Sequence, residues 1–245
     1  MKNTNEWFKD WFNSPYYHLL YQNRDYNEAD LFIKNLSKFL KIRLNANILD
    51  LACGNGRHSI TLNKLGFNVT GLDLSKNSIS IAKKSENKKL NFHIHDMRNK
   101  FGSESYEYIF NLFTSFGYFN SMDDNIKMLE SIKSMLTPQG ILIIDFLNAE
   151  KVIRELKKHE IKTIEEIRFD INKYIENKKV FKEISITDPS GDIYKFTERV
   201  QLFNIDDFNS LLNPNFEILH TFGDFYLNEF DSQISDRLII IAQAK

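Results

Sequence analysis

Two kinds of segment alternate along the first 148 residues of the chain. Short, almost wholly apolar runs predict buried strands, and stretches with apolar residues every three or four positions predict amphipathic helices. The predicted strands are residues 45–51, 67–75, 91–97, 106–115 and 140–148, and the predicted helices are 26–43, 56–66, 78–86 and 123–140, the last closed by Pro138 and Gly140. Continuous apolar strands that alternate with helices indicate a parallel sheet with helices on both faces, a doubly wound α/β fold.

The pattern changes after Asn148. A short helix over 149–158 is followed by strict alternation, in which Ile167, Phe169 and Ile171 are separated by polar residues. This alternation predicts antiparallel strands with one wet face, and the turn at 188–191 predicts a hairpin. A helix at 205–213 and strands at 216–222 and 237–243 then resume the first pattern. We therefore expect one domain from residues 1–150 and 204–245, with 151–203 inserted as an antiparallel β meander that forms a lid.

Composition excludes several classes of protein. The 245 residues carry a formal net charge of −1, which argues against a nucleic-acid-binding surface. A single cysteine, Cys53, rules out a disulfide framework, and His93 and His95 have no third ligand nearby in the sequence, so we expect no metal site. The chain starts without a signal-peptide pattern and has no run of about 18 apolar residues. We expect a cytoplasmic protein that contacts no membrane.

Acidic residues and glycines follow the predicted strands. Asp50, Gly54 and Gly56 come at the end of the first strand, Asp73 ends the second and Asp96 ends the third. Ligands of open α/β sheets bind outside the carboxyl ends of the strands, so these residues should meet in one crevice. The glycines permit close approach of the backbone to a ligand, and Asp73 is placed to accept hydrogen bonds from ribose hydroxyls.

Two phosphate-containing ligands fit this loop poorly. A Walker-type loop ends in Gly-Lys-Ser/Thr, whereas Arg57 and His58 follow the second glycine here. A dinucleotide fingerprint has a third glycine where this chain has Ser59, and Asp50 at the mouth of the loop would repel a pyrophosphate. An acid at this point suits a cationic, phosphate-free nucleoside, and S-adenosylmethionine has that character.

These motifs resemble a known family. "LDLACGNGRHS", "VTGLDLS" and "HDM" look like the glycine-rich, ribose-binding and adenine-edge motifs of class I S-adenosylmethionine-dependent methyltransferases, with the resemblance covering roughly 15–148 and 204–245. Within that class, "YYHLLYQNRDY", "HDMR" and "LFTSFGYF" are similar to N-methyltransferases of nucleotide-linked amino sugars and to a wider set of small-molecule enzymes. The resemblance implies a Rossmann-like, seven-stranded fold and S-adenosylmethionine as cofactor.

The resemblance also implies which residues bind the cofactor. They are Tyr17, Arg24, Asp50, Ala52, Gly54, Gly56, Asp73, Leu74, Asp96, Met97 and Phe113. Asp50 would hold the ammonium group, Asp73 the ribose and Asp96 the adenine amino group. Tyr17 and Arg24 would meet the carboxylate, although a plain surface helix is an open alternative for both, and Phe113 could equally be core.

The sequence indicates less about the residues that bind the methyl acceptor. Phe116 and Tyr118 are candidates for its wall, Arg98 is expected to pair with a carboxylate, and no catalytic residue is identified. The resemblance predicts in-line methyl transfer to a small-molecule nitrogen or oxygen by a monomer or homodimer. The alternatives are a methyltransferase acting on RNA or protein, and a nucleotide-cofactor-binding protein without transferase activity.

Overall fold

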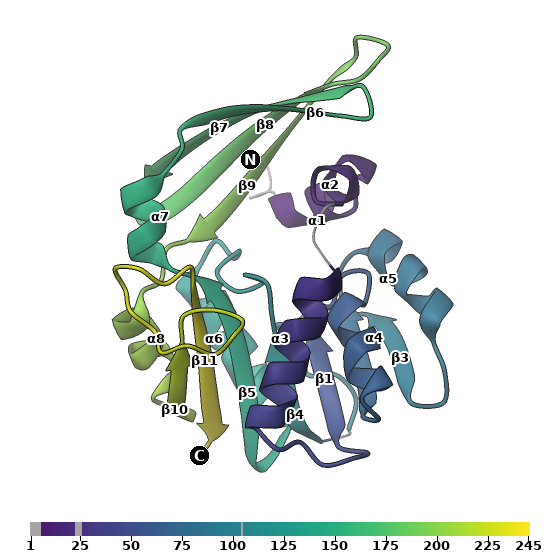
Figure 1. Ribbon diagram of the computed structural model, residues 1–245, viewed down its shortest axis with the longest axis vertical. Helices are drawn as coiled ribbons and strands as arrows, with labels where there is room; N and C mark the ends of the chain where they lie inside the picture. The colour runs from purple at the N-terminus through teal and green to yellow at the C-terminus, as the bar shows by residue number, and fades with distance from the viewer. Residues whose placement is uncertain (1–5, 23–25, 104) are drawn as a thin grey trace.

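A seven-stranded sheet forms the body of the molecule. The computed structural model describes residues 6–22, 26–103 and 105–245 (Figure 1). The strands, in the spatial order β10-β11-β5-β4-β1-β2-β3, are β10 (Phe216–Phe222), β11 (Arg237–Ala244), β5 (Leu136–Leu147), β4 (Tyr106–Asn111), β1 (Asn47–Leu51), β2 (Asn68–Asp73) and β3 (Leu90–Ile94). Strands β1 to β5 run parallel, whereas β11 is antiparallel to both neighbours. The order reverses between β1 and β4, where open α/β sheets bind ligands.

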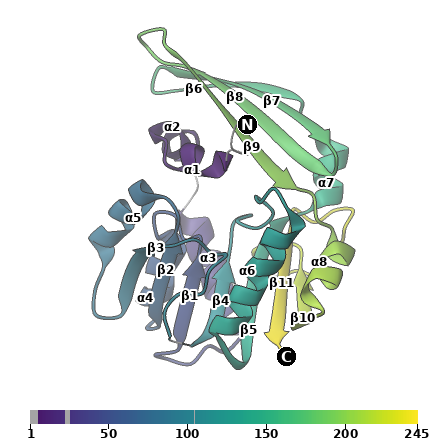
Figure 2. The same cartoon turned by 180° about the vertical axis from the view of Figure 1, so that it is seen from behind.

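Helices cover both faces of this sheet. One face carries α3 (Tyr26–Phe39), α4 (Arg57–Lys64) and α5 (Lys76–Ala82), with the short 3₁₀ turn η1 (Lys83–Ser85) after α5. The other face, turned toward the viewer in Figure 2, carries α6 (Met122–Met135) and α8 (Ile205–Leu212). Apolar side chains such as Leu36 and Leu62 on the first face, and Met128 and Phe208 on the second, are fully buried against the strands. The predicted doubly wound, Rossmann-like fold is confirmed.

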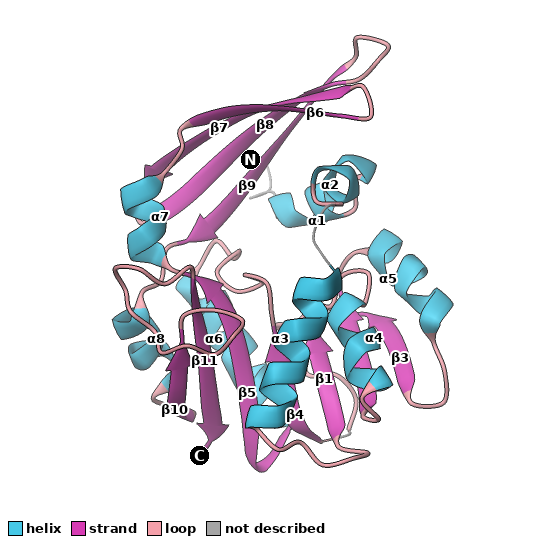
Figure 3. Ribbon diagram, in the orientation of Figure 1, coloured by secondary structure: helices cyan, strands magenta, loops and turns pink. Residues whose placement is uncertain are grey.

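The second sheet is antiparallel and four-stranded. Helix α7 (Ala149–Glu155) leads into β6 (His159–Ile164), β7 (Ile167–Glu176), β8 (Lys179–Thr187) and β9 (Ile193–Gln201), in that spatial order (Figure 3). Phe169, Ile171 and Ile184 are buried on one face while their neighbours in sequence are more exposed. The predicted alternation of buried and wet positions is therefore confirmed.

Two short N-terminal helices lie between the sheets. They are α1 (Trp7–Phe12) and α2 (Pro15–Leu20), and the views in Figures 1 and 2 both place them beneath the four-stranded sheet. Trp11 and Leu20 pack into the same buried cluster as Phe169 and Ile171. The apolar face of the four-stranded sheet is thus covered by the N-terminal segment.

Several predicted boundaries are wrong. Helix α6 ends at Met135 instead of Gly140, because Leu136 is already extended (ψ 147°) and the residue before Pro138 is biased away from the helical region. Helix α7 ends at Glu155 instead of 158. Strand β9 runs to Gln201 and pairs with β8 without a break. None of the helices that the structure describes is long and apolar enough to span a bilayer.

Candidate active site

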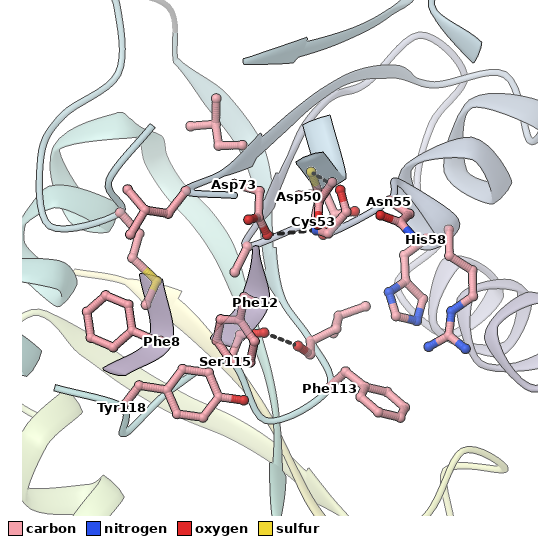
Figure 4. Close-up of a pocket in the computed structure, with 18 of the residues that line it drawn as sticks. Phe8, Phe12, Asp50, Cys53, Asn55, His58, Asp73, Phe113, Ser115 and Tyr118 are labelled. Carbon is pink, nitrogen blue, oxygen red and sulfur yellow. Dashed lines mark hydrogen bonds between the residues drawn. The ribbon is translucent and has the colours of Figure 1, made fainter. Parts of the chain in front are cut away.

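A cavity of about 260 Å³ opens at the carboxyl ends of β1 to β4, beneath α1 and α2. The predicted residues that line it are Tyr17, Asp50, Ala52, Gly54, Asp73, Leu74, Asp96, Met97 and Phe113. Gly56 does not line it, and Arg24 lies outside the described residues. In Figure 4, Phe8 and Tyr118 lie on one side of this space and Asn55 and His58 on the other. The structure thus brings together residues from successive strand ends and from the N-terminal helices.

The two glycines of the loop after β1 serve different purposes. Both have left-handed backbones, with φ of 55° at Gly54 and 80° at Gly56. A Cβ on Gly54 would meet no atom within 4 Å, whereas one on Gly56 would lie 2.6 Å from the Phe92 ring. Gly54 therefore leaves room in the cavity, while Gly56, the N-cap of α4, allows the helix to pack against β3.

Asp50 is a buried carboxylate at the end of β1. Its side chain is 1% exposed and accepts a hydrogen bond from Ser59 Oγ at 2.5 Å. Burial raises the pKa of Asp50 to about 6, against the opposing effect of the Ser59 hydrogen bond. A cationic group placed beside this carboxylate would stabilise its charged form.

Asp73 joins the end of β2 to the glycine loop. Its Oδ2 accepts from the Gly54 amide at 2.8 Å (Figure 4), and its Oδ1 accepts from the Ser75 amide at 2.7 Å. Burial raises the pKa of this carboxyl despite those hydrogen bonds. Each oxygen of a carboxylate has two acceptor positions, so both can still accept a ligand hydroxyl.

Asp96 follows β3 and is held by Arg98. The guanidinium forms a two-point contact, with Nη2 2.6 Å from Oδ2 and Nε 3.0 Å from Oδ1. Burial favours the neutral acid, but the Arg98 hydrogen bonds hold the pKa of Asp96 below its usual range. Arg98 also contacts Glu6 at 2.6 Å. The prediction that Arg98 pairs with a carboxylate is confirmed.

A strained pair of residues follows β4. Phe113 and Thr114 have φ of 61° and 59°, which L-residues rarely adopt. The buried Asp145 of β5 accepts from the Phe113 amide at 2.8 Å and from Arg237 Nε at 2.7 Å, and Arg237 also donates to Thr114 Oγ1 at 2.9 Å. Sequence reasoning missed Asp145 and Arg237, because their side chains meet this turn only after β5 and β11 have paired.

Aromatic rings line the cavity on the side of the N-terminal helices. They are Phe8, Phe12, Tyr17, Tyr21, Tyr118 and Phe119. Phe12 and Tyr118 have ring centroids 5.4 Å apart, so the loop after β4 contacts α1 directly. Sequence reasoning missed Phe8 and Phe12, although the density of aromatic residues in 7–21 is a usable signal.

The prediction that Phe116 lines the cavity is wrong. Its side chain is fully buried and packs against Phe146, Phe203 and Phe208, away from the cavity. Tyr118, two residues later, does line it. The intervening Gly117 has φ of 80°, and this change of backbone direction separates the two side chains.

Cysteine and histidine chemistry is limited at the cavity. Burial raises the pKa of the Cys53 thiol, so it is neutral and unsuited to act as a nucleophile. His18 lines the cavity, and burial lowers its pKa. Across the described ranges, no three His, Cys, Asp or Glu side chains are grouped as a metal site requires.

Comparison with known proteins identifies the family. A family model described as a methyltransferase domain matches residues 42–236. The putative methyltransferase YqeM of Bacillus subtilis (strain 168) is 30% identical over 210 residues, which are 80% of this chain and 83% of that protein. An S-adenosylmethionine-dependent methyltransferase from Clostridium acetobutylicum superposes with a TM-score of 0.79 at 20% identity, covering 93% of this chain and 95% of the other.

A further solved structure shares the fold at greater sequence distance. CalS10 of Micromonospora echinaspora, an amino pentose methyltransferase solved with S-adenosylmethionine bound, superposes with a TM-score of 0.70 at 16% identity, covering 95% of this chain and 98% of the other. The family predicted from the sequence motifs is thus confirmed. The chain belongs to the methyltransferase-domain family, as an S-adenosylmethionine-dependent methyltransferase.

Proposed function

We propose that this enzyme methylates a nitrogen or oxygen of a small molecule. The observation that carries the proposal is the make-up of the cavity, in which three strand-end carboxylates, the buried Asp50 and the partly exposed Asp73 and Asp96, line the space together with a wall of aromatic rings. S-adenosylmethionine, when bound, supplies a methyl group on a positively charged sulfur. The chain's own residues would bind that cofactor, orient the acceptor and exclude water.

The strand ends form the cofactor half of the cavity in this proposal. Asp50 would hold the ammonium group, Asp73 the ribose and Asp96 the adenine amino group. The open space beside Gly54, the buried carboxylate of Asp50 and the partly exposed carboxylate of Asp73 fit a cationic nucleoside and oppose a phosphate. Ala52, Leu74, Met97 and Phe113 would supply the remaining contacts, all of them lining the cavity. Tyr17 lines the cavity from α2, between Tyr21 and Phe12 in the aromatic wall, so we assign it to the acceptor side in place of the cofactor carboxylate.

Residues 151–203 would act as an inserted lid subdomain of the methyltransferase domain. The four-stranded sheet packs on α1 and α2, which line the cavity, so the sheet and helices would together enclose the acceptor. An enclosed space favours a small acceptor over RNA or protein. Among the described lining residues, Arg57 carries the one fixed positive charge. The cavity therefore offers few of the basic contacts that binding of a phosphate backbone needs.

Catalysis would depend chiefly on positioning. Holding the acceptor in line with the methyl group and the sulfur contributes up to about 7–11 kcal/mol in well-oriented reactions. An amine that arrives neutral needs no general base, and no side chain is assigned that role here. Aromatic rings such as Phe12 and Tyr118 would keep water out and offer electron-rich faces to an ammonium product.

A screen for acceptors tests the proposal. The purified protein is incubated with S-adenosylmethionine and a panel of amines, amino sugars, nucleotide-linked amino sugars and hydroxylated metabolites, with total RNA and a protein mixture as separate arms. Because CalS10 is described as an amino pentose methyltransferase, amino sugars are tested first. We expect release of S-adenosylhomocysteine with a small molecule. Release with RNA or protein alone, or cofactor binding with no release in any arm, would contradict the proposal.

We also propose that the protein is cytoplasmic and is a monomer or a homodimer. Size-exclusion chromatography with light scattering would decide between the two oligomeric states.

A further inference from the structure

Hydrogen-bond donors from three elements converge on the carboxylate of Glu198 in β9. Trp11 Nε1 of α1 donates to Oε1 at 2.6 Å, and the hydroxyl of Tyr21, which caps α2, donates at 2.7 Å. Lys182 Nζ of β8 lies 3.3 Å from Oε2, and Lys182 and Glu198 are direct partners in the sheet register. One side chain therefore joins both N-terminal helices to the four-stranded sheet.

This cluster is shielded from water. The Lys182 and Glu198 side chains are each 15% exposed, and Trp11 is fully buried. Trp11 packs on Phe196 of β9 at 4.8 Å between ring centroids, and Lys182 Nζ lies 4.6 Å from the centroid of the Tyr21 ring. Separating such a pair is costly, because each charge would then remain in a poorly hydrated place without its partner. The contacts should therefore persist in solution.

The cluster is connected to the cavity by a row of rings. Tyr21 lines the cavity and lies 5.1 Å from Tyr17, which lies 4.9 Å from Phe12. Phe12 in turn lies 5.4 Å from Tyr118 in the loop after β4. The wall opposite the strand ends thus runs continuously from the Glu198 cluster to the main sheet.

We propose that Glu198 is a positioning residue for the acceptor. Its carboxylate fixes α1 and α2 on the four-stranded sheet and thereby sets where Tyr21, Tyr17 and Phe12 stand in the cavity. Glu198 does not itself line the cavity. The hydrogen bonds described above for Asp50, Asp73 and Asp96 are made with Ser59, Gly54, Ser75 and Arg98, which are not members of this cluster. The inference rests on the proposed function, because it assigns the acceptor to the aromatic side.

The matched variants are Glu198→Ala, Glu198→Gln and the control Glu183→Ala. Glu183 is an exposed residue of β8 that accepts a hydrogen bond from Tyr174 at 3.1 Å, so its loss makes the same charge change on the outer side of the same sheet. Acrylamide quenching of tryptophan fluorescence reports the combined exposure of Trp7 and Trp11, which both belong to α1, and it needs no acceptor. We expect quenching to rise at least about twofold in Glu198→Ala, to a lesser extent in Glu198→Gln, which keeps one acceptor oxygen, and to stay at the wild-type level in Glu183→Ala.

Turnover of an acceptor found in the screen gives the second readout. In Glu198→Ala we expect the KM for that acceptor to rise about tenfold or more, with the affinity for S-adenosylmethionine within about twofold of wild type. Because Glu198→Ala leaves the Lys182 charge without its carboxylate partner, the double variant Glu198→Ala with Lys182→Met removes both charges and serves as the control for folding. The double variant should recover thermal stability but keep the raised KM.

Three results would overturn the inference. They are equal quenching in Glu198→Ala and wild type, a normal acceptor KM in a folded Glu198→Ala protein, and a double variant that regains both stability and acceptor KM. If the wild-type enzyme methylates no small molecule, the proposed function fails. The quenching comparison then still decides whether Glu198 holds the N-terminal helices.

Discussion

The two halves of the cavity are built in different ways. On the strand-end side, Asp73 is fixed by the backbone amides of Gly54 and Ser75, and these two amides belong to the loops that follow β1 and β2. On the aromatic side, Glu198 contacts Trp11 and Tyr21 across 187 and 177 residues of sequence. The first half is set by local backbone geometry, and the second by packing of remote elements. The first should therefore respond only to local substitutions, and the second to distant ones.

The largest effect is expected at Asp145, whose carboxylate holds the turn after β4 through the Phe113 amide and Arg237. Asp145→Ala would leave Arg237 unpaired and release the left-handed turn at Phe113, so we expect a loss of about 3–5 kcal/mol in the free energy of unfolding. Urea denaturation measures this loss. Glu107→Ala removes an ion pair with the 69% exposed Arg43 and should cost about 0–1 kcal/mol. Equal losses in the two variants would contradict the account.

The two loop glycines separate cofactor binding from stability. Gly54→Ala should weaken S-adenosylmethionine about tenfold, because its methyl group enters the cavity, with a cost in stability of about 1 kcal/mol for the left-handed backbone. Gly56→Ala should instead cost about 1–3 kcal/mol or more, because its methyl group overlaps the Phe92 ring. Calorimetric binding and urea denaturation on both variants check the contrast. An unchanged affinity in Gly54→Ala would place the cofactor elsewhere.

The pH dependence of cofactor binding tests Asp50. In the free protein its pKa is about 6, and a bound ammonium group favours the charged carboxylate, so the free protein holds more protons than the complex. Affinity should therefore rise with pH through about 6, by about tenfold between pH 5 and pH 7. Asp50→Asn should show a flatter profile, since the carboxylate beside the ammonium group no longer titrates. The same slope in both proteins would exclude Asp50 from the ammonium site.

The smallest effect is expected at Cys53, which lines the cavity from the glycine loop after β1. Its thiol is buried and neutral, so Cys53→Ala should keep turnover within about twofold of wild type. Iodoacetamide at pH 7 should leave the folded protein unmodified by mass spectrometry. Rapid alkylation with loss of turnover would show a reactive thiol instead.

The same contrast explains what the sequence could predict. The strand ends, the glycine loop and the three acids were predictable because each follows directly from a strand pattern and a local motif. Gly56 was predicted to contact the cofactor together with Gly54, but its place against the Phe92 ring, outside the cavity lining, could not be predicted because it depends on the packing of α4 on β3. The alternation in β7 predicted a sheet with one buried face, but not that α1 and α2 cover that face.

Other features depend on contacts between distant residues. Asp145 and Arg237 are 92 positions apart, and the Glu198 cluster combines residues from opposite ends of the chain. Phe116 and Tyr118 are both aromatic and two residues apart, yet the turn at Gly117 sends one into the core and the other to the cavity. No local pattern distinguishes the two.

The central claim is that strand-end carboxylates bind the cofactor and the aromatic side does not. Isothermal titration of S-adenosylmethionine into wild type, Asp73→Ala and Glu198→Ala tests it most directly. Asp73→Ala loses the charged acceptor to which the ribose hydroxyls would donate and should weaken binding roughly 100-fold, with its folding checked by circular dichroism. Glu198→Ala should remain within about twofold of wild type. Wild-type affinity in Asp73→Ala, or a comparable loss in a folded Glu198→Ala protein, would contradict the account.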